Sequence, residues 1–495
     1  MKFWFGAAVL AIVFSNVFLI DAAKARPPWI TPNDRQLRQD VELLAAFGIV
    51  QGPVNQWPLS WAHITRGIDS MPQRAWPPHV EQALARVKRH IPAGSDYHGF
   101  NYEFEARGTN EERLVRSFGR GARAEGDARV SVDKLWDKTY VRLTVGGRND
   151  PNDNDYHFDD SYIAQIVGNW VFYGGFIDQW WGPGFESGLM LTNNARPFPR
   201  VGIQRLDPKP FRTRWLRWLG PWQFNVFAGR LEGGRNDIDH PIVMGIRVSA
   251  KPFNAVEIGA SRALQLCGEG RPCTAKTWGN ALLGILDADN RGGPNEPGNQ
   301  LAGVDIRYGT TIGETAVSFY GELIGEDEDG LLIDDISVLF GAHASGALLG
   351  DFGTWRLSTE FSDTKANRII GSGPERGGIT FNHGIYTDGY SFRGRTLSHS
   401  LDTDSRLLSI RATVSDARNR SVSLVYRHAE LNDLSLINHK VSNTFESINM
   451  LEAESLIPTP YGDITFDVRV MDDRPDTPGT SDFNAAFEIG WKTQF

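Results

Sequence analysis

Residues 483–495 read FNAAFEIGWKTQF, and apolar or aromatic side chains occupy nearly every second position. The face that they form carries Ala485, Phe487, Ile489, Trp491, Thr493 and Phe495. The opposite face includes Glu488 and Lys492. Because successive side chains of an extended chain point to opposite sides, this alternation predicts a β-strand with one apolar and one polar face.

The same alternation recurs through most of the chain, from about residue 97 onward. It is clear at Val141, Leu143 and Val145, at Leu408, Ile410, Ala412 and Val414, and at Ile464, Phe466, Val468 and Val470. About 16 to 18 such runs are present, each roughly 9–11 residues long, which is the length of a tilted membrane strand. Aromatic residues recur near the ends of the apolar faces, at Trp222, Tyr308, Phe361 and Tyr426.

These features distinguish two fold classes whose strands both show this alternation of apolar and polar residues. A soluble sandwich would show the same pattern in any single strand, but the number of runs, their length and the placement of aromatics favour a membrane barrel. A sheet can cross hydrocarbon only when it closes, because every backbone polar group must be paired. We therefore predict a mainly β protein, a large antiparallel transmembrane β-barrel of about 18 strands over residues 96–495.

The polar face of the predicted barrel carries charges of both signs. It includes Arg142, Arg247, Glu257, Asp305, Arg307, Glu322, Arg356, Glu360, Arg411 and Asp467. Charges paired across a lumen can close it to bulk flow. The alternative is an open, weakly selective pore.

The first residues predict export. Lys2 is followed by an apolar run from Phe3 to Ile20, and Ala23-Lys24-Ala25 fits a cleavage site. Residues 1–25 are therefore predicted to be a signal peptide, the alternative being a retained membrane anchor. A final strand that stops on an aromatic, Phe495, resembles the C-terminal recognition signal of bacterial outer-membrane proteins. We expect the outer-membrane assembly machinery, membrane lipid and lipopolysaccharide as partners.

Residues 26–95 predict a small N-terminal three-helix bundle. Asn33 or Asp34 can cap a first helix that carries Leu37, Val41, Leu44 and Phe47 on one face, with Gly48 ending it. A second helix can run from Ser60 through Ile64 and Ile68 to Ser70. Pro77 and Pro78 can open a third, with Val80, Leu84, Val87 and Ile91 on one face.

The chain has only two cysteines, Cys267 and Cys273, within the stretch CGEGRPC. An exported protein meets an oxidising environment, so this spacing predicts a disulfide that closes one loop. Metal binding has less support, because no histidine or third cysteine lies near. Composition also argues against nucleic acid as a partner, because the net charge is -9 and no long basic run occurs.

Two segments interrupt the regular alternation: residues 168–200 are rich in Trp, Asn and Gly, and residues 386–405 contain Tyr, Arg, Asp and Gly. Aromatic rings can stack on sugar rings, while amide and guanidinium groups bind hydroxyls and acids. The same mixture suits a luminal plug. The candidate polysaccharide-binding or plug residues are Trp180, Trp181, Asn193, Asn194, Arg196, Tyr390, Arg393, Arg395 and His399.

Within these segments the chain resembles the Wzi family of capsule assembly proteins. The resemblance rests on WWGPG at Trp180–Gly184, NNARPFP at Asn193–Pro199 and GYSFRGRTLSHS at Gly389–Ser400. It implies an 18-stranded, loop-occluded, monomeric barrel with periplasmic helices and surface loops. The implied function is lectin-like attachment of capsular or other exopolysaccharide to the cell surface. The loop sequences, including Cys267–Cys273, match no pattern that would identify the glycan.

An enzyme is not expected, and neither is a cofactor or a metal. Neighbouring carboxylates such as Asp159 and Asp160 point to opposite faces of a strand, whereas a glycosidase needs two carboxyls at a defined separation. His399 lies beside serines, but no G-x-S-x-G motif accompanies it. The main alternative to polysaccharide attachment is a channel for saccharides or small solutes, and an outer-membrane hydrolase ranks below both.

Overall fold

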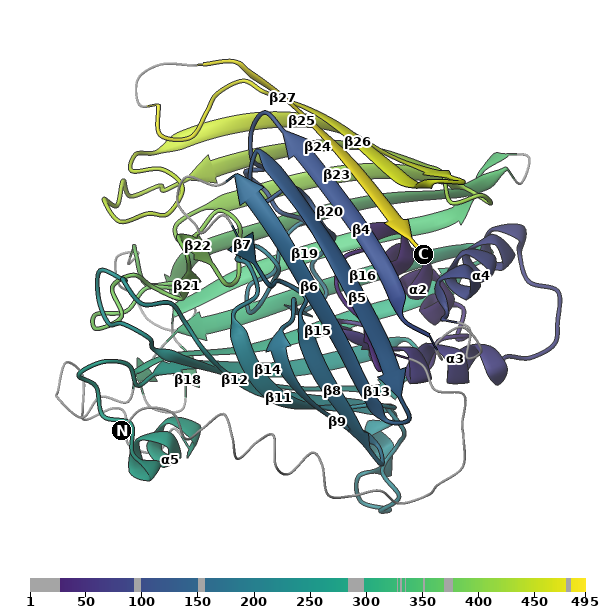
Figure 1. Cartoon of the computed structure of the whole chain (residues 1–495), viewed down its shortest axis with the longest axis horizontal. Helices are drawn as coiled ribbons and strands as arrows, with labels where there is room; N and C mark the ends of the chain where they lie inside the picture. Colours follow the sequence, from purple (N-terminus) through teal and green to yellow (C-terminus); the bar gives the residue numbers. More distant parts are fainter. Residues whose placement is uncertain are drawn as a thin grey trace.

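A computed structural model of the protein describes residues 27–92, 99–149, 156–283, 298–326, 328–329, 332–333, 335–349, 352–368, 377–477 and 482–495. The predicted signal peptide, residues 1–25, lies outside the described residues. Within them, eighteen antiparallel strands close a barrel (Figure 1). The predicted fold class is confirmed.

The barrel strands neighbour one another in chain order. They are β4 (Asn101–Thr109), β5 (Gly126–Trp136), β6 (Thr139–Asn149), β8 (Tyr162–Val167), β9 (Trp170–Phe176), β11 (Pro199–Arg205), β12 (Trp222–Arg230), β13 (Ile242–Phe253), β14 (Val256–Leu266), β15 (Gly298–Ile312), β16 (Thr315–Glu326), β19 (Asp335–Ala347), β20 (Gly353–Arg368), β23 (Arg406–Asp416), β24 (Ser421–Leu431), β25 (Glu446–Thr459), β26 (Gly462–Met471) and β27 (Asn484–Gln494). A short piece, β7 (Tyr156–His157), pairs with β6 beside β8 and continues the same wall.

The terminal strand closes the barrel. β27 pairs on one side with β26, where Phe487 lies opposite Val468, and on the other with β4, where Trp491 lies opposite Ala106. Every backbone group along this seam therefore has a neighbouring strand, as a membrane-spanning sheet requires.

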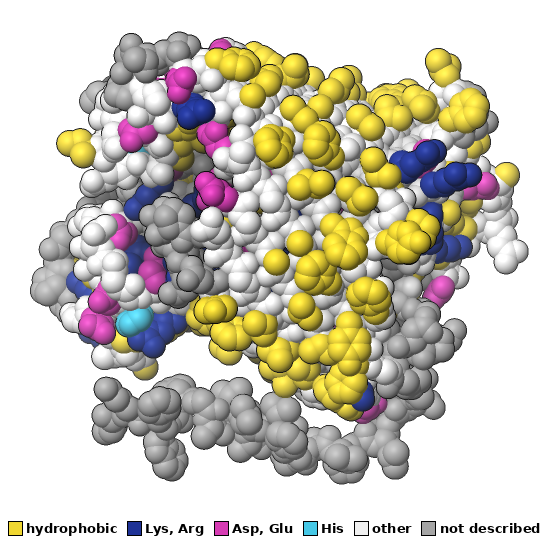
Figure 2. Space-filling model, turned by 45° about the horizontal axis from the view of Figure 1, so that its top comes forward, with side chains coloured by type: hydrophobic (Ala, Val, Ile, Leu, Met, Phe, Trp, Pro, Cys, Tyr) yellow, Lys and Arg dark blue, Asp and Glu magenta, His cyan; other side chains and the backbone are white. Residues whose placement is uncertain are grey.

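The alternation places apolar side chains outside and polar ones inside. Leu143 and Val145 on β6 are 50% and 48% exposed, whereas Thr144 between them is 0% exposed. On β23, Ile410 faces outward and Arg411 is buried in the lumen. Figure 2 shows the result on one face, where hydrophobic side chains cover the middle of the wall and charged side chains gather toward its ends.

The three predicted helices are present with the predicted caps. They are α2 (Arg35–Ala46), α3 (Trp61–Asp69) and α4 (Pro78–His90). Asp34 accepts a hydrogen bond from the Leu37 N–H at 2.9 Å, and Ser60 accepts one from Ala62 at 3.1 Å. α4 begins at a proline. Proline has no N–H, and at the first position of a helix an N–H would have no acceptor within the helix.

The helices enter one mouth of the barrel. The Glu257 carboxylate on β14 accepts the N–H groups of Val54 and Asn55, both at 2.9 Å. Arg86 on α4 binds Asp40 on α2 at 2.6 Å and donates to the carbonyl of Asp416, the last residue of β23, at 3.1 Å. Among the described residues, none of the helices is both long and apolar enough to cross a membrane.

The two ends of the barrel differ in their connections. At the helix end, a connection of two residues joins β5 to β6, β13 to β14 and β25 to β26. At the opposite end, here called the loop end, long segments join β9 to β11 and β20 to β23. The C-terminus lies at the helix end, near α2 and α4 (Figure 1).

Candidate functional site: a basic cleft above a plugged lumen

The segment that joins β9 to β11 folds back into the barrel. Its short strand β10 (Trp180–Trp181) pairs with β2 (Gln56–Trp57) from the N-terminal region, so that Trp180 lies opposite Trp57. Both tryptophans of β10 are 0% exposed. The connection and the N-terminal region thus meet inside the lumen and form a plug.

Carboxylates on the barrel wall hold this plug. Glu360 on β20 accepts the N–H groups of Phe185, Glu186 and Ser187 at 2.7, 3.1 and 3.0 Å. The Glu186 carboxylate in turn receives Arg411 at 2.6 Å and Arg427 at 2.8 Å. The carboxylates of the wall and the N–H groups of the plug are buried in the lumen, where water cannot reach them. These charge-assisted hydrogen bonds therefore supply the partners that the buried polar groups need.

The WWGPG stretch needs its glycines for this path. A Cβ at Gly184 would lie 2.1 Å from the Ser187 carbonyl oxygen. Gly182 has a φ of +106° and a Cβ there would lie 2.7 Å from the Glu322 carboxylate. Neither position can take a side chain without moving the plug.

Two asparagines tie the plug to neighbouring loops. The Asn193 amide donates to the Gly119 carbonyl at 2.6 Å, in the connection between β4 and β5. Asn194 donates to the Thr396 carbonyl at 2.9 Å, in the connection between β20 and β23. The two segments that interrupt the alternation in the sequence therefore lie against each other.

Tyr390 and His399 belong to the same packed interior. Tyr390 is 1% exposed, and the His399 ring lies 2.8 Å from the Ser362 hydroxyl. Burial lowers the pKa of His399 to about 3, so the ring is neutral at physiological pH. It cannot serve there as a cation for an acidic ligand.

The three arginines among the predicted site residues reach a cleft instead. Arg196, Arg393 and Arg395 line a cavity of about 830 Å³ at the loop end, and buried Asn194 contributes to its lining. The other five predicted residues do not line it. The nine candidates thus divide into a buried set and a cleft set.

Basic side chains outnumber acidic ones in the cleft lining, nine to five. The basic set is Arg113, Arg116, Arg123, Arg148, Arg196, Arg235, Arg393, Arg395 and Lys440. The acidic set is Glu111, Glu112, Glu232, Asp388 and Asp402. Carboxylates outside the lining pair with some of the basic groups, including Arg113 with Glu488, Arg123 with Asp178 and Arg196 with Asp159. The lining itself presents more cationic than anionic groups to the cavity, which favours anionic ligands.

Ion pairs position the cleft arginines without covering them all. Glu112 receives both Arg395 at 2.6 Å and Arg116 at 2.7 Å, and the Arg395 side chain remains 30% exposed. Arg196 binds Asp159 at 2.8 Å. The backbone N–H of Arg393 donates to Glu232 at 2.7 Å.

The connection between β4 and β5 also contributes basic residues to the cleft, which the sequence motifs did not predict. Arg113, Arg116 and Arg123 come from this stretch, which reads EERLVRSFGRGARA over residues 111–124. Four arginines within eleven positions were a usable signal. The stretch has neither strand nor helix periodicity, which is typical of a connection with a role of its own.

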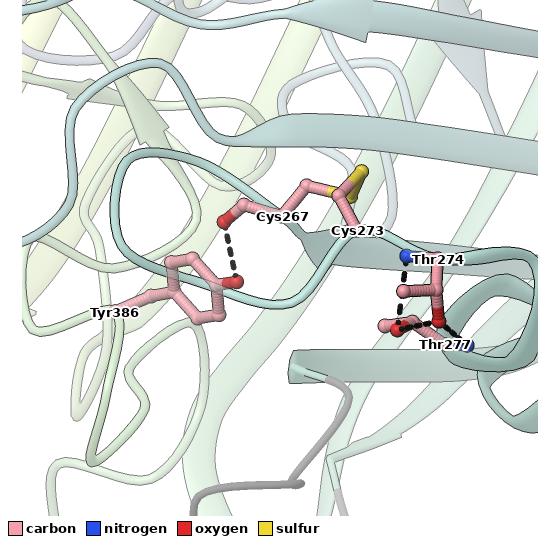
Figure 3. The surroundings of a disulfide bond; sticks show 5 residues. All are labelled: Cys267, Cys273, Thr274, Thr277 and Tyr386. Atoms are coloured by element: carbon pink, nitrogen blue, oxygen red, sulfur yellow. Dashed lines mark hydrogen bonds between the residues drawn. A yellow bond between two sulfur atoms is a disulfide. The ribbon is translucent and has the colours of Figure 1, made fainter.

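A disulfide lies beside the same loops. Cys267 and Cys273 are bonded, and the Tyr386 hydroxyl donates to the Cys267 carbonyl at 2.9 Å (Figure 3). Arg235 further donates to the carbonyls of Ser391 and Gly389 at 2.9 and 3.0 Å. These contacts fix the segment that carries Arg393 and Arg395.

One acidic cluster deeper in the lumen has the spacing of a cation site. Glu452, Glu454 and Asp467 have oxygens within 4.8 Å of one another. Arg113 lies among them, 2.9 Å from Glu452 and 3.1 Å from Glu454. The guanidinium already supplies the positive charge that such a cluster requires.

Comparisons with known proteins agree with this geometry. Residues 97–471 match the protein family described as capsule assembly protein Wzi. A Klebsiella pneumoniae protein, described as an uncharacterized 55.8 kDa protein in the cps region, is 31% identical over 354 residues, 70% of this chain and 67% of that protein.

A solved structure shares the fold. Wzi of Escherichia coli, described as a carbohydrate-binding β-barrel of the outer membrane involved in group 1 capsule assembly, superposes with a TM-score of 0.79 at 24% identity. The match covers 94% of this chain and 99% of that chain. The family resemblance predicted from the sequence motifs is confirmed: the chain belongs to the Wzi family of capsule assembly proteins.

Proposed function

We propose that this protein attaches an acidic capsular or other exopolysaccharide to the surface of the bacterial outer membrane without chemical conversion. The observation that carries the proposal is the basic cleft of about 830 Å³ above a plugged lumen. Uronic acid and other acidic sugars present carboxylates that guanidinium groups bind in a bidentate manner. The carbohydrate binding described for the Escherichia coli barrel supports the same assignment.

The orientation follows from the two ends of the barrel. Outer-membrane barrels have short periplasmic turns and long extracellular loops. The helix end with its two-residue turns then faces the periplasm, and the loop end with the cleft faces outward. In this arrangement residues 26–95 form the periplasmic unit, and a monomer suffices because one chain supplies the whole cleft.

The plug and cleft residues have separate roles. Trp180, Trp181, Tyr390 and His399 shape and seal the interior, where no glycan reaches them. Arg196, Arg393 and Arg395 contact the acidic groups of the polysaccharide.

The test is retention of polysaccharide on cells. A strain whose own copy is replaced by Arg393→Gln/Arg395→Gln/Lys440→Gln should release exopolysaccharide into the medium while total production stays unchanged. The loops should still fold, because Glu112 keeps Arg116 and Asp388 keeps Asn236. A matched control, Arg74→Gln/Lys88→Gln/Arg418→Gln, removes three exposed cations elsewhere. Wild-type retention by the cleft variant would refute the proposal.

A further inference from the structure

The connection between β11 and β12, residues 206–221, differs from the other connections at the helix end. It contains the run FRTRWLRWLG over residues 211–220. Trp215 is 88% exposed and Trp218 is 66% exposed. Tryptophan is enriched where a protein crosses the membrane–water interface, because its ring is apolar and its N–H is polar.

Three arginines of this loop are also exposed: Arg212, Arg214 and Arg217. Within the described part of the chain, no carboxylate lies within ion-pair distance of any of them. The one acidic residue of the loop, Asp207, is already shared by Arg66 at 3.1 Å and Lys209 at 3.2 Å. The loop therefore presents three cations that the protein itself does not neutralise.

The loop covers an apolar groove on the outer wall. Phe211 stacks on Trp222 with ring centroids 4.3 Å apart, and Phe211 and Leu219 border a groove of about 730 Å³. Small residues, Ala260 on β14 and Gly321 on β16, leave the space open. Its volume lies within the range of ligand pockets, about 300–1,000 Å³, and its lining is almost entirely apolar, which suits a hydrocarbon chain.

The loop is held at the helix end of the barrel. Asp207 binds Arg66 on α3, and the Lys251 N–H near the end of β13 donates to the Pro221 carbonyl at 2.9 Å. The arginines thus lie at the rim of the wall, where lipid headgroups meet the barrel, while the groove lies on the wall itself. Cationic side chains at this height attract anionic lipid.

We propose that residues 206–221 and the groove bind one anionic glycerophospholipid. An acyl chain fills the groove beside Ala260, and Arg212, Arg214 and Arg217 bind the phosphate. Trp215 and Trp218 enter the interface beside the headgroup. The assignment of this lipid to the periplasmic leaflet rests on the proposed orientation, but the binding itself does not.

The test is lipid retention by the purified full-length protein in native mass spectrometry. The protein is equilibrated with equal amounts of phosphatidylglycerol and phosphatidylcholine in detergent. Wild type should retain phosphatidylglycerol preferentially, and Arg212→Gln/Arg214→Gln/Arg217→Gln should lower that preference about tenfold or more. The control Arg74→Gln/Lys88→Gln/Arg418→Gln removes the same charge from the same end and should keep the preference.

A second variant tests the groove without changing charge. Ala260 faces outward and is exposed, so Ala260→Leu fills the groove without entering the lumen. It should reduce retention of both lipids. Equal retention of the two lipids by wild type, or equal losses in the arginine variant and its control, would overturn the proposal.

Two other occupants have distinct outcomes that would also overturn it. Stronger retention of lipopolysaccharide than of phosphatidylglycerol would identify lipopolysaccharide as the ligand of the loop. A dimer that Trp215→Ser/Trp218→Ser dissociates would identify a second copy of the chain as the partner. Polysaccharide retention by the arginine variant stays at the wild-type level in either case, so failure here is distinguishable from failure of the proposed function.

Discussion

Single side chains hold the plug at a few points, and Glu360 is the clearest. One carboxylate accepts three consecutive N–H groups of the plug and the Tyr320 hydroxyl at 3.0 Å. Hydrogen bonds to a charged acceptor stabilise by about 1.5–3 kcal/mol, and each donor left unpaired in the interior costs about 1–3 kcal/mol. The closed lumen therefore depends on a small number of buried acceptors.

Glu360→Ala should loosen the plug and raise ion conductance in planar bilayers above that of the wild type. The physical reason is that the N–H groups of Phe185, Glu186 and Ser187 lose their acceptor. They can then form hydrogen bonds only with water, which requires the plug to shift and admit water to the lumen. Glu430→Ala is the control, because Glu430 lies at a half-exposed position and pairs with Arg406. Conductance that stays at the wild-type level in Glu360→Ala would show that these bonds do not close the lumen.

Gly184→Ala should loosen the plug by a steric route, which proteolysis can detect. Its Cβ would lie 2.1 Å from a backbone oxygen, so the segment must move. Gly126→Ala is the matched control, because nothing lies within 4 Å of the Cβ built there. We expect faster proteolysis of the connection between β9 and β11 in Gly184→Ala alone. Equal cleavage rates in the two variants would contradict the steric argument.

At the scale of elements, α2 and α4 are joined by Asp34 and His90. Asp34 caps α2, and its carboxylate lies 3.3 Å from the His90 ring. Burial opposes the charge on His90, but the hydrogen bond and charge of Asp34 outweigh it and raise the pKa of His90 to about 9. Burial likewise opposes the charge on Asp34, yet His90 and the Leu37 N–H lower its pKa.

The stability from this pair should depend on pH in a definite direction. The raised pKa of His90 means that its contribution is complete below about pH 6.5 and is lost as the pH rises through about 9. The lowered pKa of Asp34 means that the pair is also lost in strong acid. Asp34→Asn should therefore speed proteolysis of residues 35–90 at about pH 7 and have a much smaller effect at about pH 10. An effect of the same size at both would show that the cap alone matters.

Strands and helices could be predicted because their signals are local. Leu143 and Val145 alternate with Thr144 within one strand, and Ser60 and Pro78 mark helix starts within one turn. The plug could not be predicted in the same way. Trp180 and Arg393 both come from segments that interrupt the alternation, but Trp180 is buried in the plug and Arg393 lines the cleft.

The residues missed in the β4–β5 connection show the same limit. Arg113 is separated by more than 300 residues from Glu452 and Glu488, which it binds at 2.9 Å each. No spacing along the chain indicates contacts between such distant segments. The neutral state of His399 could not be predicted from the sequence either. Its pKa is lowered by burial, not by a charged neighbour in the sequence.

The whole molecule separates its surfaces by chemistry. The wall is apolar, the lumen is filled by paired charges and the plug, and the loop end has a cleft with a surplus of basic groups. This arrangement leaves the cleft accessible at the loop end while the plug closes the lumen. The family motifs contribute to both parts: WWGPG lies in the plug, whereas Arg196, Arg393 and Arg395 of the other two motifs line the cleft.

Binding to an acidic polysaccharide should weaken with salt. Raising the ionic strength from about 0.1 M to about 1 M shortens the Debye length from about 10 Å to about 3 Å and screens the exposed arginines. Affinity of the purified protein, measured by surface plasmon resonance on immobilised exopolysaccharide, should fall accordingly. An affinity that is independent of salt would indicate recognition through stacking and hydroxyl contacts.

Recognition of acidic glycan by the cleft can be measured with two forms of one polysaccharide, native and carboxyl-reduced. Each is tested for binding to wild type and to Arg393→Gln/Arg395→Gln/Lys440→Gln. Arg393, Arg395 and Lys440 are partly exposed, and three cation–carboxylate contacts worth about 0.5–1 kcal/mol each would make the variant bind the native polymer roughly 10- to 100-fold more weakly than wild type. Wild type should also bind the reduced polymer weakly. Equal binding of both polymers by wild type, or undiminished binding by the variant, would contradict a basic cleft that holds acidic glycan.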